Sequence, residues 1–182
     1  MIKIITPITK NVIISLKAGD VVSISGVIYT ARDATHKKMI ETLNRGEELP
    51  FEIKDQIIYY AGPCPAKPGK VIGLAGPTTS GRMDAYTPRL LQLGLGGMIG
   101  KGARSKEVID SIVGNKSIYF GATGGAGALI AGCITGQEII AYPELGPEAL
   151  RRLEVVNFPA TVIIDSQGYN LYEMGKAKYK ME

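Results

Sequence analysis

A nine-residue loop at 76–84, with the sequence GPTTSGRMD, gathers the side chains best suited to chemistry in this chain. Two threonines and a serine supply hydroxyl groups, and Arg82 supplies a planar fork of donors that fits a carboxylate or a phosphate. An apolar run at 71–75 precedes the loop, and a helix is predicted to begin near Met83. A glycine loop between a strand and a helix exposes backbone N–H groups and the positive end of the helix dipole. The loop therefore predicts an anion site.

Two other interpretations of this loop are open. Gly76 and Gly81 have the spacing of a nucleotide-binding P-loop, but Arg82 replaces its lysine and Met83 replaces the hydroxyl residue that binds magnesium. A nucleotide site is therefore disfavoured. The other interpretation is an ordinary tight turn with a surface arginine, because glycine, serine and threonine are common in turns.

A second cluster, TARDATHKK at 30–38, lies where a predicted strand meets a predicted helix. We expect Arg32 at the end of the strand, and we expect Asp33 to cap the helix by accepting from a first-turn N–H. His36, the only histidine, is either an acid–base group or anion ligand, or a hydrogen-bonded structural residue. The two lysines at 37–38 are expected to be solvated.

Two further segments are rich in glycine. The segment at 96–102, GGMIGKG, places Lys101 between two glycines, where the backbone can approach a ligand closely; the alternative is a flexible turn with an exposed lysine. The segment at 121–127 does not fit the dinucleotide pattern G-x-G-x-x-G, because Ile130 stands where the third glycine is needed. Close backbone packing in the core is the preferred interpretation of 121–127.

The chain holds only two cysteines, Cys64 and Cys133. They are too few for a disulfide framework, and with one histidine they cannot form a four-ligand zinc site without carboxylates. An iron–sulfur cluster normally takes several thiolates. We therefore expect this chain to bind no metal by itself, and both thiols to stay reduced in a cytoplasmic protein.

The charge balance and hydropathy exclude other classes. Lys and Arg number 21 against 17 Asp and Glu, which gives a net charge of +4, and Phe numbers only 3. The basic residues are scattered, so nucleic-acid binding is not expected. No segment reaches the roughly 20 apolar residues that cross a membrane, and the first ten residues do not form a secretory signal.

The elements that must position these residues alternate along the chain. Runs rich in valine and isoleucine predict strands, and apolar residues three or four apart predict helices. Strands are predicted at 11–16, 21–29, 57–60, 71–75, 98–99, 117–121, 138–142 and 161–164, with hairpin turns at 17–20 and 166–168. Helices are predicted at 35–45, from 83, at 105–113 and at 147–153. The pattern indicates one compact α/β domain with a mixed sheet over 1–182, and a frayed tail at 176–182.

Three cationic side chains fall at the ends of predicted strands, where α/β proteins tend to bind ligands. These are Arg32, Arg82 and Lys101. Several cations beside a hydroxyl-rich glycine loop suit a small dianion such as a dicarboxylate. The residues alone do not name a reaction.

Three motifs occur in a fixed order: TARDATHK at 30–37, GPTTSGRMD at 76–84 and MIGKG at 98–102. With them the chain resembles the β subunit, or C-terminal domain, of class I iron–sulfur fumarases and the related L-tartrate dehydratases, over nearly its whole length. The resemblance implies a swivelling β/β/α fold. It also implies a separate α subunit whose three cysteines hold a [4Fe–4S] cluster, and a higher oligomer of αβ pairs.

The implied reaction is the reversible hydration of fumarate to (S)-malate, by a hydro-lyase active only with its α subunit. A β subunit of L-tartrate dehydratase is the alternative, and a non-catalytic module that binds small anions is an alternative of another class. The resemblance makes Thr78 the candidate base at the C3 proton, helped by an acid–base partner from the α subunit. It makes Arg82 and Arg32 the clamps of the substrate carboxylates, with Arg82 counted beside Thr78 as a catalytic residue. The implied substrate contacts are Arg32, Thr79, Ser80, Gly81, Lys101 and His36.

Overall fold

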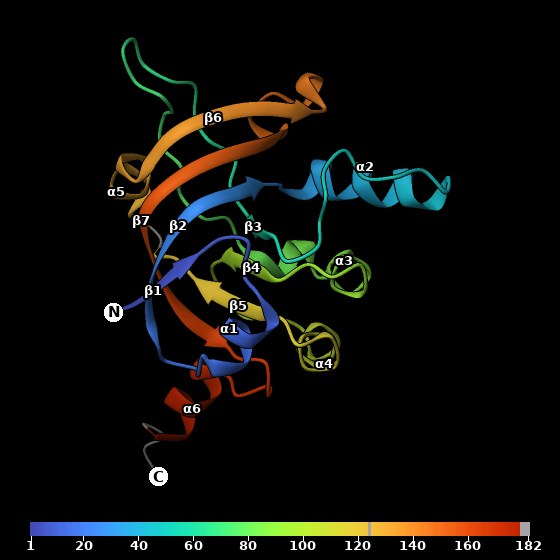
Figure 1. The fold of residues 1–182 in the computed structure, drawn as a ribbon, viewed down its shortest axis with the longest axis vertical. Helices are drawn as coiled ribbons and strands as arrows, with labels where there is room; N and C mark the ends of the chain where they lie inside the picture. Colours follow the sequence, from blue (N-terminus) through green and yellow to red (C-terminus); the bar gives the residue numbers. More distant parts are fainter. Residues whose placement is uncertain (124, 179–182) are drawn as a thin grey trace.

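A computed structural model describes residues 1–123 and 125–178 of the chain, and its architecture rests on one mixed sheet (Figure 1). The strands run in the order β1-β2-β3-β4-β5-β7-β6. Their bounds are β1 Ile2–Ile5, β2 Val21–Thr30, β3 Ile57–Tyr59, β4 Gly97–Gly100, β5 Ile118–Gly121, β6 Ile134–Ala141 and β7 Leu150–Ile164. The prediction of an α/β fold with a mixed sheet is confirmed.

The sheet closes on itself through its longest strands. Strands β1 to β5 pair in parallel, whereas β7 runs antiparallel to β5, β6 and β2. Because β2 pairs with both β3 and β7, the five strands β2, β3, β4, β5 and β7 form a closed barrel. The parallel strands all end at one rim of this barrel.

The helices fill the connections between strands, and Figure 1 shows α2, α3 and α4 together on one side of the sheet. Their bounds are α1 Lys10–Ser15, α2 Asp33–Asn44, α3 Thr87–Gln92, α4 Lys106–Asn115, α5 Gly127–Gly132 and α6 Leu171–Lys178. Two short 3-10 helices are η1 Ser80–Met83 and η2 Pro143–Glu148. Ser105 caps α4 by accepting from the N–H of Val108.

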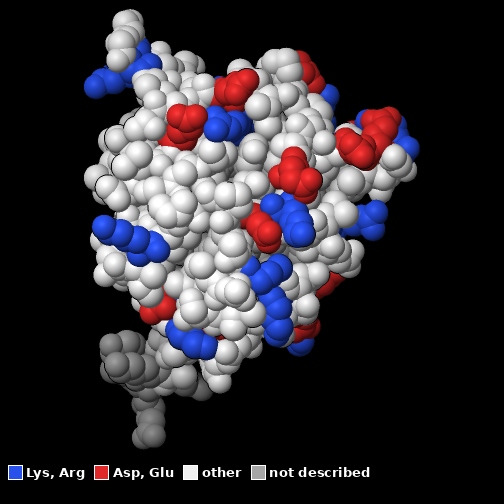
Figure 2. Space-filling model, viewed as in Figure 1, with Lys and Arg blue, Asp and Glu red and all other residues white. Residues whose placement is uncertain are grey.

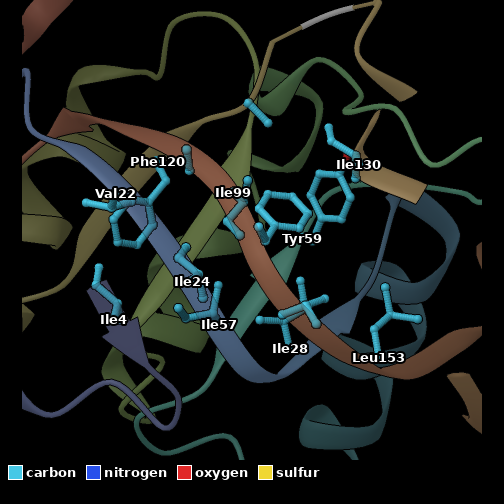
Figure 3. Close-up of a cluster of buried hydrophobic side chains, with 14 of the residues drawn as sticks. Ile4, Val22, Ile24, Ile28, Ile57, Tyr59, Ile99, Phe120, Ile130 and Leu153 are labelled. Atoms are coloured by element: carbon cyan, nitrogen blue, oxygen red, sulfur yellow. The ribbon is translucent and has the colours of Figure 1, made fainter. Parts of the chain in front are cut away.

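Alternation along the strands builds two cores, because successive strand residues face opposite sides of a sheet. Side chains facing the barrel interior include Ile24, Ile57 and Phe120 (Figure 3). In β3, β4 and β5 the residues next to the inward-facing ones face outward and form a second core with the apolar faces of α3 and α4. That outer core includes Ile58, Met98, Tyr119, Leu90, Leu91, Val108 and Ile112.

The strand predicted at 11–16 is wrong: α1 occupies this segment, so 17–20 is not a hairpin turn. Thr9 caps α1 by accepting from the N–H of Val12. Ile13 and Leu16 are buried, three residues apart, whereas Val12 and Ile14 are exposed. The N-cap and the single buried face therefore favour a helix here, although valine and isoleucine in this segment favour a strand.

The strand predicted at 71–75 is also wrong. Gly73 packs against the backbone of Cys64 and Pro65 so closely that a Cβ atom would overlap it. The Cys64 and Gly73 N–H groups bond back within this loop, and the Ala75 N–H bonds to Gly127 O. The backbone hydrogen bonds named here join residues 71–75 to the preceding loop and to the start of α5, and none of them pairs this segment with a strand of the sheet.

The last third of the chain differs in three places. The helix predicted at 147–153 is mostly strand, because η2 stops at Glu148 and β7 begins at Leu150. Hydrogen bonding of β7 to β2 on one side and β6 on the other prevails over the local helix preference. The turn predicted at 166–168 is present, with Ile164 and Asn170 paired across it as an isolated antiparallel bridge, but the chain then enters α6 at Leu171 instead of a second strand. In the predicted frayed tail, 176–178 belong to α6, and 179–182 lie outside the described residues.

The first ten residues hold a strand that the sequence analysis missed. In β1, Ile2 pairs with Val22 and Ile4 pairs with Ile24. Within the part of the chain that the structure describes, no helix is long and apolar enough to cross a membrane.

Candidate functional site

The anion loop inserts between two strand ends at the barrel rim. The Thr78 N–H donates to Tyr60 O at 2.7 Å, and the Lys101 N–H donates to Thr78 O at 3.3 Å. Thr79 then pairs with Lys101 as a parallel bridge. Tyr60 and Lys101 directly follow β3 and β4, so the loop extends the sheet beyond the ends of both strands. Brought together in this way, Thr78 and Lys101 occupy the rim where α/β proteins tend to bind ligands.

Ser80 anchors the loop to the interior of the protein. Its side chain is fully buried, and its hydroxyl lies 2.8 Å from the hydroxyl of Tyr119. Tyr119 donates in turn to Gly102 O at 2.9 Å. A Cβ atom at Gly100 would overlap the Ser80 hydroxyl, so glycine at 100 permits the close approach. The predicted loop donor Ser80 therefore turns its hydroxyl inward, while Thr79, Gly81 and Lys101 are exposed and Thr78 is half-buried.

The two arginines meet through a shared carboxylate. Arg82 Nε donates to Asp33 Oδ1 at 2.8 Å, and Arg32 Nη2 lies 3.8 Å from Asp33 Oδ2. Arg32 Nη2 also lies 3.5 Å from Glu148 Oε1. The Arg32 side chain packs against Gly62, which follows β3. The structure thus places Arg32 and Arg82 side by side, although they are far apart in sequence.

The prediction that Asp33 caps its helix is wrong. Helix α2 begins at Asp33 itself, and its N-cap residue, Arg32, makes no side-chain capping bond. One Asp33 oxygen accepts from Arg82 instead, while the Ala34 N–H donates to Glu148 Oε2 at 2.9 Å. A long-range arginine contact thus replaces the local cap that sequence spacing predicts.

His36 lies beneath the arginines rather than at the surface. Its side chain is fully buried, and Nδ1 lies 2.8 Å from Arg32 O, while the ring packs near Tyr60 and Tyr86. Burial lowers the pKa of His36 to about 4, so the ring is neutral at neutral pH. This placement is that of a residue supporting the Arg32 backbone, and its contact with a substrate stays a prediction.

A buried ion pair that the sequence analysis missed joins the two rim loops. Arg104 Nε donates to Asp84 Oδ1 at 2.7 Å, and the Ser105 N–H donates to Asp84 Oδ2 at 2.6 Å. The guanidinium lies over the rings of Tyr60 and Tyr119, at 5.4 and 5.0 Å. Burial opposes its charge, but Tyr60, Asp84 and Tyr119 together keep the pKa of Arg104 above its usual value. Asp84 is the last residue of the 76–84 loop, and this position was the only feature of the sequence that pointed to the pair.

On the face of the molecule shown in Figure 2, basic and acidic side chains lie next to one another rather than in separate patches. Figure 2 shows Lys and Arg side chains beside Asp and Glu side chains, separated by broad uncharged areas. On the face in view, no large area carries a single sign. The extended basic stripe that nucleic acid requires is therefore missing from this face.

The thiols do not form a cluster site. Cys64 is exposed in the loop after β3, and Cys133 is partly buried after α5, where burial raises the pKa of its thiol. Over residues 1–123 and 125–178, no three His, Cys, Asp or Glu side chains gather in a way that could hold a metal. The described residues thus do not fit an iron–sulfur cluster.

A cavity of about 610 Å³ lies away from the rim residues. The loop at 64–74 and helix α5 line it, together with Ile134 of β6. None of the predicted site residues contributes to its wall.

Comparison with known proteins gives consistent matches. The family model described as Fumarase C-terminus matches residues 1–175. The aerobic class I fumarate hydratase of Salmonella typhimurium is 44% identical over 154 residues, which cover 83% of this chain and 26% of that protein. Fumarate hydratase 2 of Leishmania major is 41% identical over 157 residues, covering 85% and 28%. A candidate L(+)-tartrate dehydratase beta subunit of Methanocaldococcus jannaschii is 40% identical over 172 residues, covering 91% and 88%.

The chain spans about a quarter of the length of these two fumarate hydratases, but most of the tartrate dehydratase subunit. The family match includes all three motifs, and with them Arg32, Thr78, Arg82 and Lys101. The relatives named here are hydro-lyases by name. On this evidence, the chain belongs to the Fumarase C-terminus family.

Proposed function

We propose that this chain is the β subunit of a two-subunit hydro-lyase that adds water to fumarate to form (S)-malate. The observation that carries the proposal is the rim arrangement: two arginines share Asp33, beside a loop that pairs Thr78 with Lys101. Coverage of 88% of a protein named as a beta subunit supports a two-chain arrangement.

Each rim residue has a proposed part in the reaction. Arg32 and Arg82 bind the two substrate carboxylates, because guanidinium groups match carboxylates in charge and shape. Lys101 adds a third cationic contact, with Thr79 and Gly81 completing the loop. Negative charge builds on the carboxylate beside the carbon that loses its proton, and fixed cations stabilise that charge.

Thr78 is the proposed proton-transfer residue at C3 of the substrate. An alcohol is a poor base at neutral pH, so a neighbouring acid–base group must assist it. His36 is buried with a pKa of about 4, and it packs beneath Arg32. We therefore assign the assisting group to the α subunit, and we place the [4Fe–4S] cluster there as well.

A second candidate is the β subunit of an L-tartrate dehydratase. It is favoured by the match to the M. jannaschii protein, whose length this chain nearly fills. Tartrate is also a dicarboxylate, so the same arginines suit both substrates. The two functions differ in the substrate that the complex converts.

The test is co-expression with the cysteine-containing partner, followed by anaerobic purification and assays with fumarate, (S)-malate and L-tartrate. We expect the partner to co-purify, and we expect the complex to interconvert fumarate and (S)-malate faster than it dehydrates L-tartrate. Preference for tartrate would establish the second candidate. Dicarboxylate binding without turnover in the intact complex would indicate a non-catalytic anion-binding module.

A further inference from the structure

We infer that Asp33 is a positioning residue, whose carboxylate sets the relative placement of Arg32 and Arg82 and turns the outer edge of Arg82 toward a substrate carboxylate. This inference rests on the proposed function. It assigns a role to a residue that sequence spacing predicts only as a helix cap.

The geometry divides the two Asp33 oxygens between the two arginines. Oδ1 accepts from Arg82 Nε at 2.8 Å, a distance typical of a charge-assisted hydrogen bond, and Oδ2 lies 3.8 Å from Arg32 Nη2. Arg32 follows β2, whereas Arg82 lies in η1. Asp33 is thus the side chain that contacts both guanidinium groups, through a hydrogen bond to Arg82 and an ion pair with Arg32.

A carboxylate is suited to this place for an electrostatic reason. Two guanidinium groups held close together repel each other, and a negative charge between them offsets that repulsion. Asp33 stands at the first position of α2, where the helix dipole also favours a negative charge. Its side chain is only 30% exposed, so water screens the two contacts less than on an open surface.

The contact uses one side of the Arg82 guanidinium and leaves the other side available. Asp33 takes the Nε–H, and among the described residues neither Nη group of Arg82 has a hydrogen-bond partner. The side chain is 53% exposed. A carboxylate can therefore bind end-on across both Nη groups, which is a bidentate arrangement that arginine favours.

Glu148 cannot replace Asp33 in this role. It lies 3.5 Å from Arg32 Nη2, but its other oxygen accepts from the Ala34 N–H. It makes no contact with Arg82 among the described ion pairs. Glu148 therefore anchors Arg32 alone, whereas Asp33 links both arginines.

The test measures binding of succinate, a dicarboxylate without the reacting double bond, to the αβ complex by calorimetry. Because Asp33→Ala removes a charge-assisted hydrogen bond that orients Arg82, we expect it to weaken succinate binding by about 10-fold or more. Asp33→Asn should retain part of the affinity, since its amide oxygen can still accept from Arg82. The matched control is Glu144→Gln, which removes an exposed ion pair between η2 and Lys38 of α2.

A double-mutant cycle separates positioning from a general structural effect. If Asp33 acts mainly through Arg82, then Asp33→Ala should cost about 3-fold or less in the Arg82→Ala background. An equal loss in both backgrounds would overturn the inference, as would unchanged succinate binding in Asp33→Ala with an active wild-type complex. A wild-type complex that converts no dicarboxylate, while Asp33→Ala still weakens succinate binding, would refute the proposed function and leave the role of Asp33 standing.

Discussion

At the scale of single residues, the account depends on side chains that are fixed on one side and open on the other. Arg82 is held at Nε by Asp33 while about half of its side chain is exposed. Thr78 is held through its backbone by Tyr60 and Lys101. Such residues can be changed without removing core packing, so activity and stability can be measured separately.

Replacing Arg82 with alanine should abolish most activity of the reconstituted complex. We expect kcat/KM for fumarate to fall by about 100-fold or more, because a charge-assisted bidentate contact is lost at the reacting dicarboxylate. The melting temperature of the complex should stay close to that of wild type, since the side chain is half exposed. Near-wild-type turnover in this variant would refute the role of Arg82.

Replacing Thr78 with valine removes the hydroxyl and keeps the shape and backbone. We expect kcat to fall by about 100-fold, within the range that positioned acid–base groups contribute, with little change in KM. The matched control is Thr135→Val on β6, whose hydroxyl donates to Glu154 O far along the chain. A Thr78→Val complex with unchanged kcat would assign proton transfer to the partner alone.

The buried histidine should make stability depend on pH. The pKa of His36 is about 4 in the folded chain and about 6.5 when exposed, so the unfolded state binds the extra proton between these values. The stabilisation is therefore present above pH 6.5 and is lost as the pH falls toward 4. We expect wild type to lose about 3 kcal/mol more than His36→Gln across this window, measured by urea unfolding at each pH. Parallel pH profiles of the two proteins would contradict this.

The sequence predicts a site most readily where its candidate residues lie within one short segment. The hydroxyls and guanidinium of the 76–84 loop predict an anion site, and the structure places this loop at the barrel rim, while anion binding itself stays a prediction. The contact of Asp33 with Arg82 was not predictable, because only the folded chain brings α2 and η1 together. Arg104 was missed for the same reason: a lone arginine before a capped helix gives no sign that it will be buried.

At the scale of elements, local patterns succeeded where packing agreed with them. Strand β2 and helix α4 match their predicted segments closely, because alternation or a cap coincides with burial. The prediction failed at α1, where a cap prevailed over β-branched residues, and at β7, where pairing on two sides prevailed over a local helix. The β2–β7 pairing that closes the barrel joins Val21 to Thr161, which a local pattern cannot reveal.

The pair formed by Arg104 and Asp84 should stabilise the rim loops as a unit. We expect Arg104→Met to lower the free energy of unfolding by about 3–5 kcal/mol, because it leaves a carboxylate without its buried partner. Changing both residues, as Arg104→Met with Asp84→Asn, should cost less than the sum of the single changes. Urea unfolding is the measurement. The control is Lys106→Met, which removes an exposed ion pair with Asp110 within α4. Equal stability of Arg104→Met and wild type would contradict the placement of this pair.

At the scale of the whole molecule, the barrel presents the candidate site residues along one rim. Arg32, Thr78, Arg82 and Lys101 come from three separate segments of the chain, and the parallel strands bring these segments to that rim. The described residues offer cations and hydroxyl groups there, but no set of metal ligands. The proposal that a second chain completes the site rests on the family relationship and on the match to a protein named as a beta subunit.

The most direct test of this claim is to measure fumarate hydration by each purified chain alone and by the two chains mixed anaerobically at increasing ratios. We expect no turnover by this chain alone, and activity that rises with added cluster-bearing partner until the two reach a fixed stoichiometry. Arg82→Ala chain should bind the same partner without restoring that activity. Turnover by this chain alone, or full activity of the partner without it, would contradict the account.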